Sequence, residues 1–208
     1  MQRDQSAGFA LIGGTLAGLV TMANHPTGHA LLGDFERVAL VNRAVHSLAI
    51  AGTIATMYGL VRLSRAFGDR KELADAALVS YGFGAIAVMF AAIASGFVGT
   101  DIAARVLEAG DSGRTIYDPI LDYNWAFNQA CTRVFVVTAS LGIGLWSVAM
   151  LRHPAFGRAL GVAGIVIALG AAVATIAGMP MNIHGFGAIV LAHGAWLIWT
   201  GVKLMARQ

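Results

Sequence analysis

Six long apolar runs, separated by mostly short polar stretches, make up most of the chain. The runs cover residues 8–24, 38–63, 76–99, 126–151, 159–179 and 183–205. A helix needs roughly 17–25 apolar residues to cross the hydrocarbon core of a bilayer, and each run is that long. None alternates apolar and polar positions as the strand of a membrane β-barrel does. An α-helix is then the remaining structure that satisfies the hydrogen bonds of the backbone in lipid. The pattern predicts an all-α polytopic membrane protein, a single domain (1–208) built as a bundle of six transmembrane helices with short loops.

The longest connection, residues 100–125, is predicted to lie outside the membrane. Its first part places Ile102 and Val106 on one helical face and Arg105 and Glu108 on the other. That spacing is typical of a short amphipathic helix lying on a membrane surface. We therefore expect one longer outer loop that contains an interfacial helix.

Small residues recur every four positions in three of the runs, which lets helix backbones approach closely where lipid provides no hydrophobic drive. The stripes are Gly14 and Gly18 in the first run, Ala87, Ala91, Ser95 and Gly99 in the third, and Gly170, Ala174 and Gly178 in the fifth. This pattern predicts that the first, third and fifth runs form the centre of the bundle.

The composition agrees with a chain that has lipid as its solvent. Hydrophobic residues make up 57% and charged residues 12% of the chain, with a mean hydropathy of +0.70, far from the averages of soluble domains. The net charge is only +3, without the dense basic surface that nucleic-acid binding uses, so nucleic acid is not an expected partner. The single cysteine, Cys131, excludes an intramolecular disulfide and a multi-cysteine metal cluster.

Lysine and arginine in the connections predict the orientation of the bundle. One side carries nine of them and the other carries five, and cytoplasmic connections of membrane proteins carry the excess. The nine are Arg3, Arg62, Arg65, Arg70, Lys71, Arg152, Arg158, Lys203 and Arg207. Both termini lie on this side. We therefore expect an integral protein of a bacterial inner membrane with both termini cytoplasmic.

Histidines gather on the opposite, outer side of the predicted bundle. His25 and His29 lie in the first outer connection, His184 opens the sixth run, and His46 lies in the outer half of the second. Imidazole together with carboxylate is a ligand set that suits zinc or another first-row divalent ion. The sequence therefore predicts a metal site formed by these four histidines.

A metal at this position predicts an enzyme that acts on a lipid, a lipid-linked substrate or an apolar small molecule. The ion would activate water or polarise a carbonyl or phosphoryl oxygen. Asp34 or Glu36 is the predicted general base, and Arg43 is the predicted site for an anionic headgroup. Membrane lipids are the expected partners.

Two other interpretations stay open on the sequence alone. His46 and His193 are the predicted axial ligands of a haem, or the contacts of a quinone, in a redox protein, with Arg43 or Arg133 binding propionates. The chain is also interpreted as a non-catalytic transporter, a sensor, or a subunit of an oligomer or larger complex, whose polar side chains line a cavity or hold the bundle together.

Overall fold

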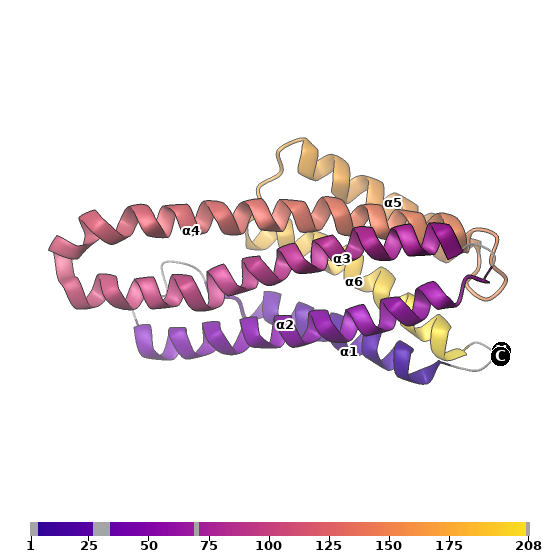
Figure 1. Cartoon of the computed structure of the whole chain (residues 1–208), viewed down its shortest axis with the longest axis horizontal. Helices are drawn as coiled ribbons and strands as arrows, with labels where there is room; N and C mark the ends of the chain where they lie inside the picture. The colour runs from indigo at the N-terminus through magenta and orange to yellow at the C-terminus, as the bar shows by residue number, and fades with distance from the viewer. Residues whose placement is uncertain (1–3, 27–33, 69–70, 207–208) are drawn as a thin grey trace.

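The computed structural model describes residues 4–26, 34–68 and 71–206, and their only regular secondary structure is helical (Figure 1). The elements are α1 (Gln5–Ala23), α2 (Phe35–Arg65), α3 (Lys71–Ile93), the π-helical segment η3 (Ala94–Val98), α4 (Gly99–Met150), α5 (Arg158–Ile176) and α6 (Ile183–Ala206). Within these described ranges, six helical stretches are long and apolar enough to cross a membrane. The predicted all-α bundle is confirmed, and the ends of α1, α2, α5 and α6 fall within three residues of the predicted ends.

The connection between the third and fourth runs differs from the predicted outer loop. Helix continues through η3 to Gly110 and returns from Arg114 to Met150, so the two arms form a long hairpin that projects beyond the other helices at the left of Figure 1. Gly110 has φ 60° and ψ −154°, a combination that glycine adopts easily because it has no Cβ.

The apolar face predicted to lie on the membrane is covered by protein in this hairpin. Ala103 and Val106 are buried. The two arms are joined by Asn124 Nδ2, which donates to the Ala94 carbonyl at 2.9 Å, and by Asn128 Nδ2, which donates to the Ala91 carbonyl at 2.8 Å. Of the two residues on the predicted apolar face, Val106 is buried and Ile102 is partly exposed, so the pattern is confirmed in part, and this arm packs against the returning helix.

The helices pack in chain order, with α1 between α2 and α6 and with α3 and α5 on either side of α4. The predicted centre of the bundle needs correction. Among the six candidate spans the most buried is that of α4, at 56% of its most apolar window, against 33–39% for the others. Gly14 does face α2, but a Cβ on Gly18 or Gly170 would meet no atom within 4 Å. The inner face of α5 is instead formed by Gly161, Gly164, Ala168 and Ala171.

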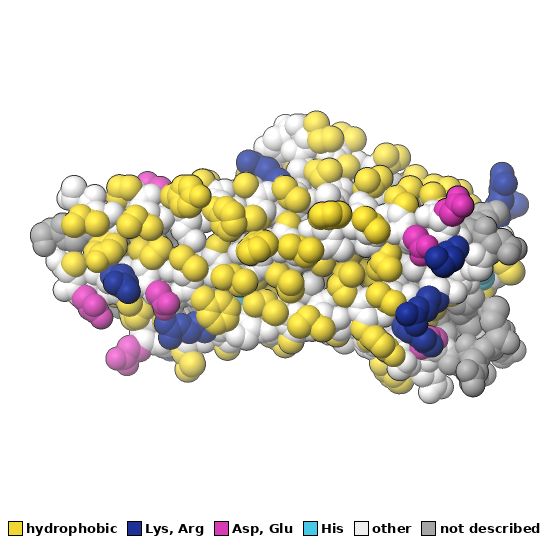
Figure 2. All heavy atoms as spheres, viewed as in Figure 1, with side chains coloured by type: hydrophobic (Ala, Val, Ile, Leu, Met, Phe, Trp, Pro, Cys, Tyr) yellow, Lys and Arg dark blue, Asp and Glu magenta, His cyan; other side chains and the backbone are white. Residues whose placement is uncertain are grey.

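Large apolar side chains cover the outside of the bundle between its two ends. Phe9, Leu40, Phe83, Val166 and Ile176 are each at least 65% exposed. Figure 2 shows this apolar belt, with most Lys, Arg, Asp and Glu side chains toward the ends. The start of α1 and the end of α6 meet at one end, where a Cβ on Gly8 would contact Met205 and the Gly201 carbonyl. We call this the terminal end, and the other the hairpin end.

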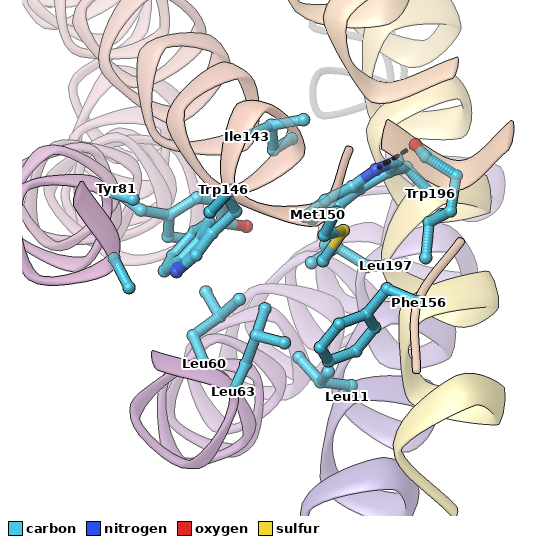
Figure 3. Close-up of a cluster of buried hydrophobic side chains, with 14 of the residues drawn as sticks. Leu11, Leu60, Leu63, Tyr81, Ile143, Trp146, Met150, Phe156, Trp196 and Leu197 are labelled. Atoms are coloured by element: carbon cyan, nitrogen blue, oxygen red, sulfur yellow. Dashed lines mark hydrogen bonds between the residues drawn. The ribbon is translucent and has the colours of Figure 1, made fainter. Parts of the chain in front are cut away.

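The largest buried side chains occupy the half of the bundle nearer the terminal end. Trp146 from α4 and Trp196 from α6 lie among leucines of α1, α2 and α6 (Figure 3). Both indoles are bonded: Trp146 Nε1 donates to Ser64 Oγ at 3.0 Å, and Trp196 Nε1 donates to the Leu160 carbonyl at 3.3 Å. This half is therefore the packed core of the molecule.

Candidate functional site

Two of the predicted histidines meet at the hairpin end. His25 follows the last turn of α1 and His46 lies in α2, yet their ring centroids are 4.8 Å apart, with the rings edge to face at 71°. The contact follows from the antiparallel packing of α1 on α2. Thr21 Oγ1 fixes it by donating to the Val45 carbonyl at 2.9 Å. We call His25 and His46 the histidine pair.

Each imidazole of the pair is held by a backbone carbonyl. His46 Nδ1 lies 2.7 Å from the Asn42 carbonyl oxygen, and His25 Nδ1 lies 2.9 Å from that of Pro26. A carbonyl only accepts, so Nδ1 carries the proton in both rings and the lone pair of the neutral ring is on Nε2. Neither Nε2 has a hydrogen bond to any described residue. Metal-binding histidines are commonly oriented in this way, with the non-ligating nitrogen donating to a carbonyl or carboxylate.

The π-helical segment forms the wall behind His46. Gly96 faces it so closely that a Cβ there would overlap the His46 side chain. Asn42, only 2% exposed, donates from Nδ2 to the Ser95 carbonyl and to Thr100 Oγ1, both at 2.9 Å. Asn42 therefore orients His46 through its backbone and anchors η3 through its side chain. Such π segments often occur at functional sites, because the irregular turn redirects carbonyls and side chains.

An ion pair lies one turn away from His46 at the surface. Arg43 Nη2 is 2.7 Å from Asp101 Oδ1, and the two side chains are 49% and 64% exposed. A pair this exposed contributes at most about 1 kcal/mol to stability. The Arg43 guanidinium, predicted to bind an anionic headgroup, is thus paired with the Asp101 carboxylate. Arg43 would have to release Asp101 before it bound a headgroup.

The two predicted general bases lie at the start of α2. Asp34 precedes the helix and Glu36 is in its first turn, and both are exposed. Asp34 lines a shallow cleft of about 340 Å³ together with Asn24, Pro26, Arg37, Val38 and Val41. Neither histidine of the pair lines this cleft, and Asp34 precedes His46 by twelve residues along α2, which is about 18 Å of helix.

Burial of the His25 ring lowers its pKa, although the hydrogen bond to the Pro26 carbonyl opposes the shift. Losing water penalises the imidazolium more than the neutral ring. His25 is therefore neutral at pH 7, which is the form that coordinates a metal.

The other two predicted metal ligands do not join the pair in the described structure. His184 is exposed at the start of α6, where its backbone N–H donates to Asn182 Oδ1 at 3.1 Å as part of a helix cap. His29 lies outside the described residues. Within residues 4–26, 34–68 and 71–206, no three His, Cys, Asp or Glu side chains form a group that holds a metal.

The predicted cofactor residues lie apart from one another. His193 is buried at 3% exposure and faces α4, where its Nε2 is 3.2 Å from Ser140 Oγ. His46 instead faces η3 and the ring of His25. Arg133 is exposed on α4 and makes no ion pair with any described residue.

A larger cleft of about 820 Å³ opens at the terminal end, far along the bundle from the histidine pair. Its charged lining consists of two cations and two carboxylates, Lys71, Glu72, Asp75 and Arg152. Lys71 and Asp75 already pair at 2.7 Å. The formal charges of this lining therefore balance.

Comparison of the chain with protein-family models, with curated proteins and with solved structures finds no match. The histidine pair is therefore interpreted from its own geometry.

Sequence reasoning missed the contribution of α3 and α4 to this site. Gly96, Thr100 and Asp101 all lie beside residues of α2, but none was a predicted site residue. The available signal was weak. Thr100 and Asp101 directly follow Gly99 at the end of the third apolar run, which places polar groups at about the depth of Asn42. Helix spacing alone does not show that they contact Asn42.

We expect Gly96→Ala to disturb the pair through η3. The new methyl group would overlap His46, and the α2–η3 contact would have to open, at a cost of about 1–3 kcal/mol. Thermal unfolding in detergent should show a lower midpoint. Gly82→Ala in α3 is the control, because its Cβ would meet only Met57 Cε at 3.7 Å. Equal midpoints for the two variants would contradict the contact.

Proposed function

We propose that this chain is an integral membrane protein with both termini in the cytoplasm, as in a bacterial inner membrane. The support is the apolar belt between two charged ends, since a soluble protein rarely exposes so much contiguous apolar surface. The start of α1 and the end of α6 belong to the terminal end, which carries the described cations of the predicted cytoplasmic side: Arg62, Arg65, Lys71, Arg152, Arg158 and Lys203. The excess of cations is the feature that supports this orientation.

We also propose that the histidine pair binds a zinc-like divalent ion at the outer membrane boundary. One observation carries the proposal: two adjacent imidazoles each use Nδ1 on a carbonyl and leave Nε2 unbonded. A catalytic zinc site has three protein ligands and one open position for water or substrate, so the pair would supply two of those ligands. The ion supplies Lewis acidity to that oxygen and lowers the pKa of bound water.

The proposed reaction is hydrolysis of a lipid or lipid-linked substrate. A site at the depth where α1 ends can be reached by a substrate whose chains stay in the apolar belt. Asp34, which shares a cleft with Pro26, the residue after His25, would accept the proton of the attacking water, and Glu36 is the alternative acceptor. Arg43 exchanges Asp101 for an anionic headgroup.

Cobalt titration tests the metal site directly. Co²⁺ bound to two imidazoles absorbs visible light, so addition of Co²⁺ to purified protein should produce a saturable spectrum that one equivalent of Zn²⁺ removes. His25→Ala and His46→Ala should each weaken binding at least about tenfold, since even residues that only support a ligand cost that much. Binding should also weaken as the pH falls, because protons compete for Nε2.

His184→Ala is the matched control, because that imidazole is exposed and is not part of the histidine pair in the described structure. His29→Ala asks whether the third predicted ligand takes part. A protein that binds no stoichiometric Co²⁺ or Zn²⁺, or one in which His184→Ala is as harmful as His46→Ala, would overturn the proposal.

A non-catalytic role has one observation in its favour. The buried polar groups around His46 and His193 bond to the protein itself, as Asn42 does to Ser95 and Thr100 and His193 does to Ser140, so they also serve to hold helices together. This role would be favoured if the protein bound metal but Asp34→Asn did not change its turnover of phospholipid or lipid-ester substrates.

A further inference from the structure

The cleft at the terminal end lies between the start of α3 and the end of α4. Its volume of about 820 Å³ is within the range of sites for small ligands. The two helices run antiparallel, and Ser80 Oγ fixes their register by donating to the Thr138 carbonyl at 2.8 Å. The first turn of α3 therefore lies beside the last turn of α4, directly outside the predicted apolar runs 76–99 and 126–151.

One cation and one carboxylate in the lining have no ion-pair partner among the described residues. Lys71 Nζ pairs with Asp75 Oδ2 at 2.7 Å, whereas Glu72 and Arg152 form no ion pair in the part of the chain that the structure describes. Both residues are exposed. A ligand that carries one positive and one negative group complements this lining, whereas a plain anion on Arg152 would also lie near the Glu72 carboxylate.

Apolar surface continues from the cleft toward the middle of the bundle. The apolar part of the lining consists of Leu73, Val148 and Leu151. On α3, Val79 and Phe83 lie four and eight residues beyond Asp75, which places them on the same helical face, and they are 60% and 65% exposed. On α4, Leu141 lies seven residues before Val148, and the two are 56% and 46% exposed. Figure 2 shows side chains of both charges beside the apolar belt at the terminal end, at the right of the view. A ligand with a polar group in the cleft can therefore rest its apolar chains on the belt.

We propose that this cleft binds the zwitterionic headgroup of a phospholipid from the cytoplasmic leaflet, with its phosphate on Arg152 and its ammonium group on Glu72. A guanidinium donates two parallel N–H bonds to a phosphate, and a carboxylate accepts charge-assisted bonds from an ammonium group. A choline headgroup has no N–H to donate, so an ethanolamine-type headgroup is the better match. The inference rests on the proposed membrane insertion and orientation, and it is independent of the histidine pair.

Native mass spectrometry of the whole chain in detergent measures this binding with lipids that carry identical oleoyl chains. The probes are phosphatidylethanolamine, phosphatidylcholine and phosphatidylglycerol. We expect phosphatidylethanolamine to bind about fivefold more tightly than either of the others, which is the largest contribution expected from one exposed ion pair. Soluble glycerophosphoethanolamine should compete only weakly, because it has the same headgroup but no chains to rest on the belt.

Two substitutions at exposed lining residues should change this selectivity in different ways. Glu72→Gln removes the carboxylate and leaves the lining with a net positive charge, so the preference should move from phosphatidylethanolamine toward phosphatidylglycerol. Arg152→Gln removes the partner of the phosphate and should weaken binding of both lipids about fivefold. Arg158→Gln is the matched control, because Arg158 is an exposed cation of the same end that does not line the cleft.

Equal affinities of the unmodified protein for phosphatidylethanolamine and phosphatidylglycerol would overturn the proposal. A loss in Arg158→Gln as large as that in Arg152→Gln would do the same, and competition by glycerophosphoethanolamine at the affinity of the lipid would assign the cleft to a soluble zwitterion instead. His46→Ala should leave all lipid affinities unchanged, so failure of the metal site and failure of this cleft are separate results. Extraction of the chain from membranes by alkaline carbonate without detergent would contradict the insertion on which the proposal rests.

Discussion

Gly14→Val is expected to separate α1 from α2 and to lower the free energy of unfolding by about 3 kcal/mol, the upper part of the range for overpacked cores. A Cβ on Gly14 would lie 2.5 Å from the Gly52 carbonyl oxygen and 2.8 Å from the Thr56 nitrogen, and a Cβ on Gly52 would lie 2.8 Å from the Gly14 carbonyl oxygen. These neighbours are backbone atoms, which cannot rotate away. The two helices would therefore have to move apart along the contact that brings His25 to His46.

Gly13→Val is the control for this prediction. It makes the same change in the same turn of α1, but a Cβ on Gly13 would meet no atom within 4 Å. Chemical unfolding in detergent micelles, followed by circular dichroism, measures both variants. Similar losses of stability in the two variants would mean that the glycine acts through helix propensity and not through the α1–α2 contact.

Trp146→Ala is expected to have the largest effect of any substitution in the packed core, about 3–5 kcal/mol. The side chain is completely buried, contacts the Tyr81 ring at 5.9 Å between centroids, and donates to Ser64 Oγ. Removing it leaves a cavity among α2, α3 and α4 and takes away the N–H that donates to the Ser64 oxygen. Ser64 retains its own bond to the Ala74 carbonyl at 3.1 Å, so part of the polar contact between α2 and α3 survives.

Two further variants separate the contributions to this effect. Trp146→Phe removes the indole N–H while keeping most of the volume, and we expect a loss of about 1 kcal/mol, which is typical of one hydrogen bond. Trp199→Ala removes the same side chain from a position that is 41% exposed on the apolar belt, and should change little. An effect of Trp199→Ala as large as that of Trp146→Ala would contradict the assignment of Trp146 to the core.

The core and the histidine pair lie in different parts of the bundle, so a defect in metal binding can be distinguished from a loss of stability. The large core side chains lie toward the terminal end, whereas the histidine pair lies at the hairpin end, held by polar contacts to η3. Truncating His46 or His25 therefore leaves the main core intact. A loss of metal binding with an unchanged unfolding midpoint would locate the defect in the site.

The sequence by itself determined the long apolar helices and their approximate ends. These are local properties, because a run of about 20 apolar residues selects a helix in lipid whatever lies next to it, and Pro26 ends the first run as the structure has it. The apolar pattern also placed Val106 on the inward face of its helix. It did not identify what covers that face.

Only the tertiary structure decided which polar groups meet. His25 reaches His46 because Gly14 and Gly52 let α1 and α2 cross closely, and His46 is locked by a π-helical turn that no spacing rule predicts. His184 and His193 were equally plausible from the sequence, yet one is exposed and the other faces Ser140. The physical reason is that each helix buries one face only, and the rotation of that face is set by close contacts with neighbours distant in the chain.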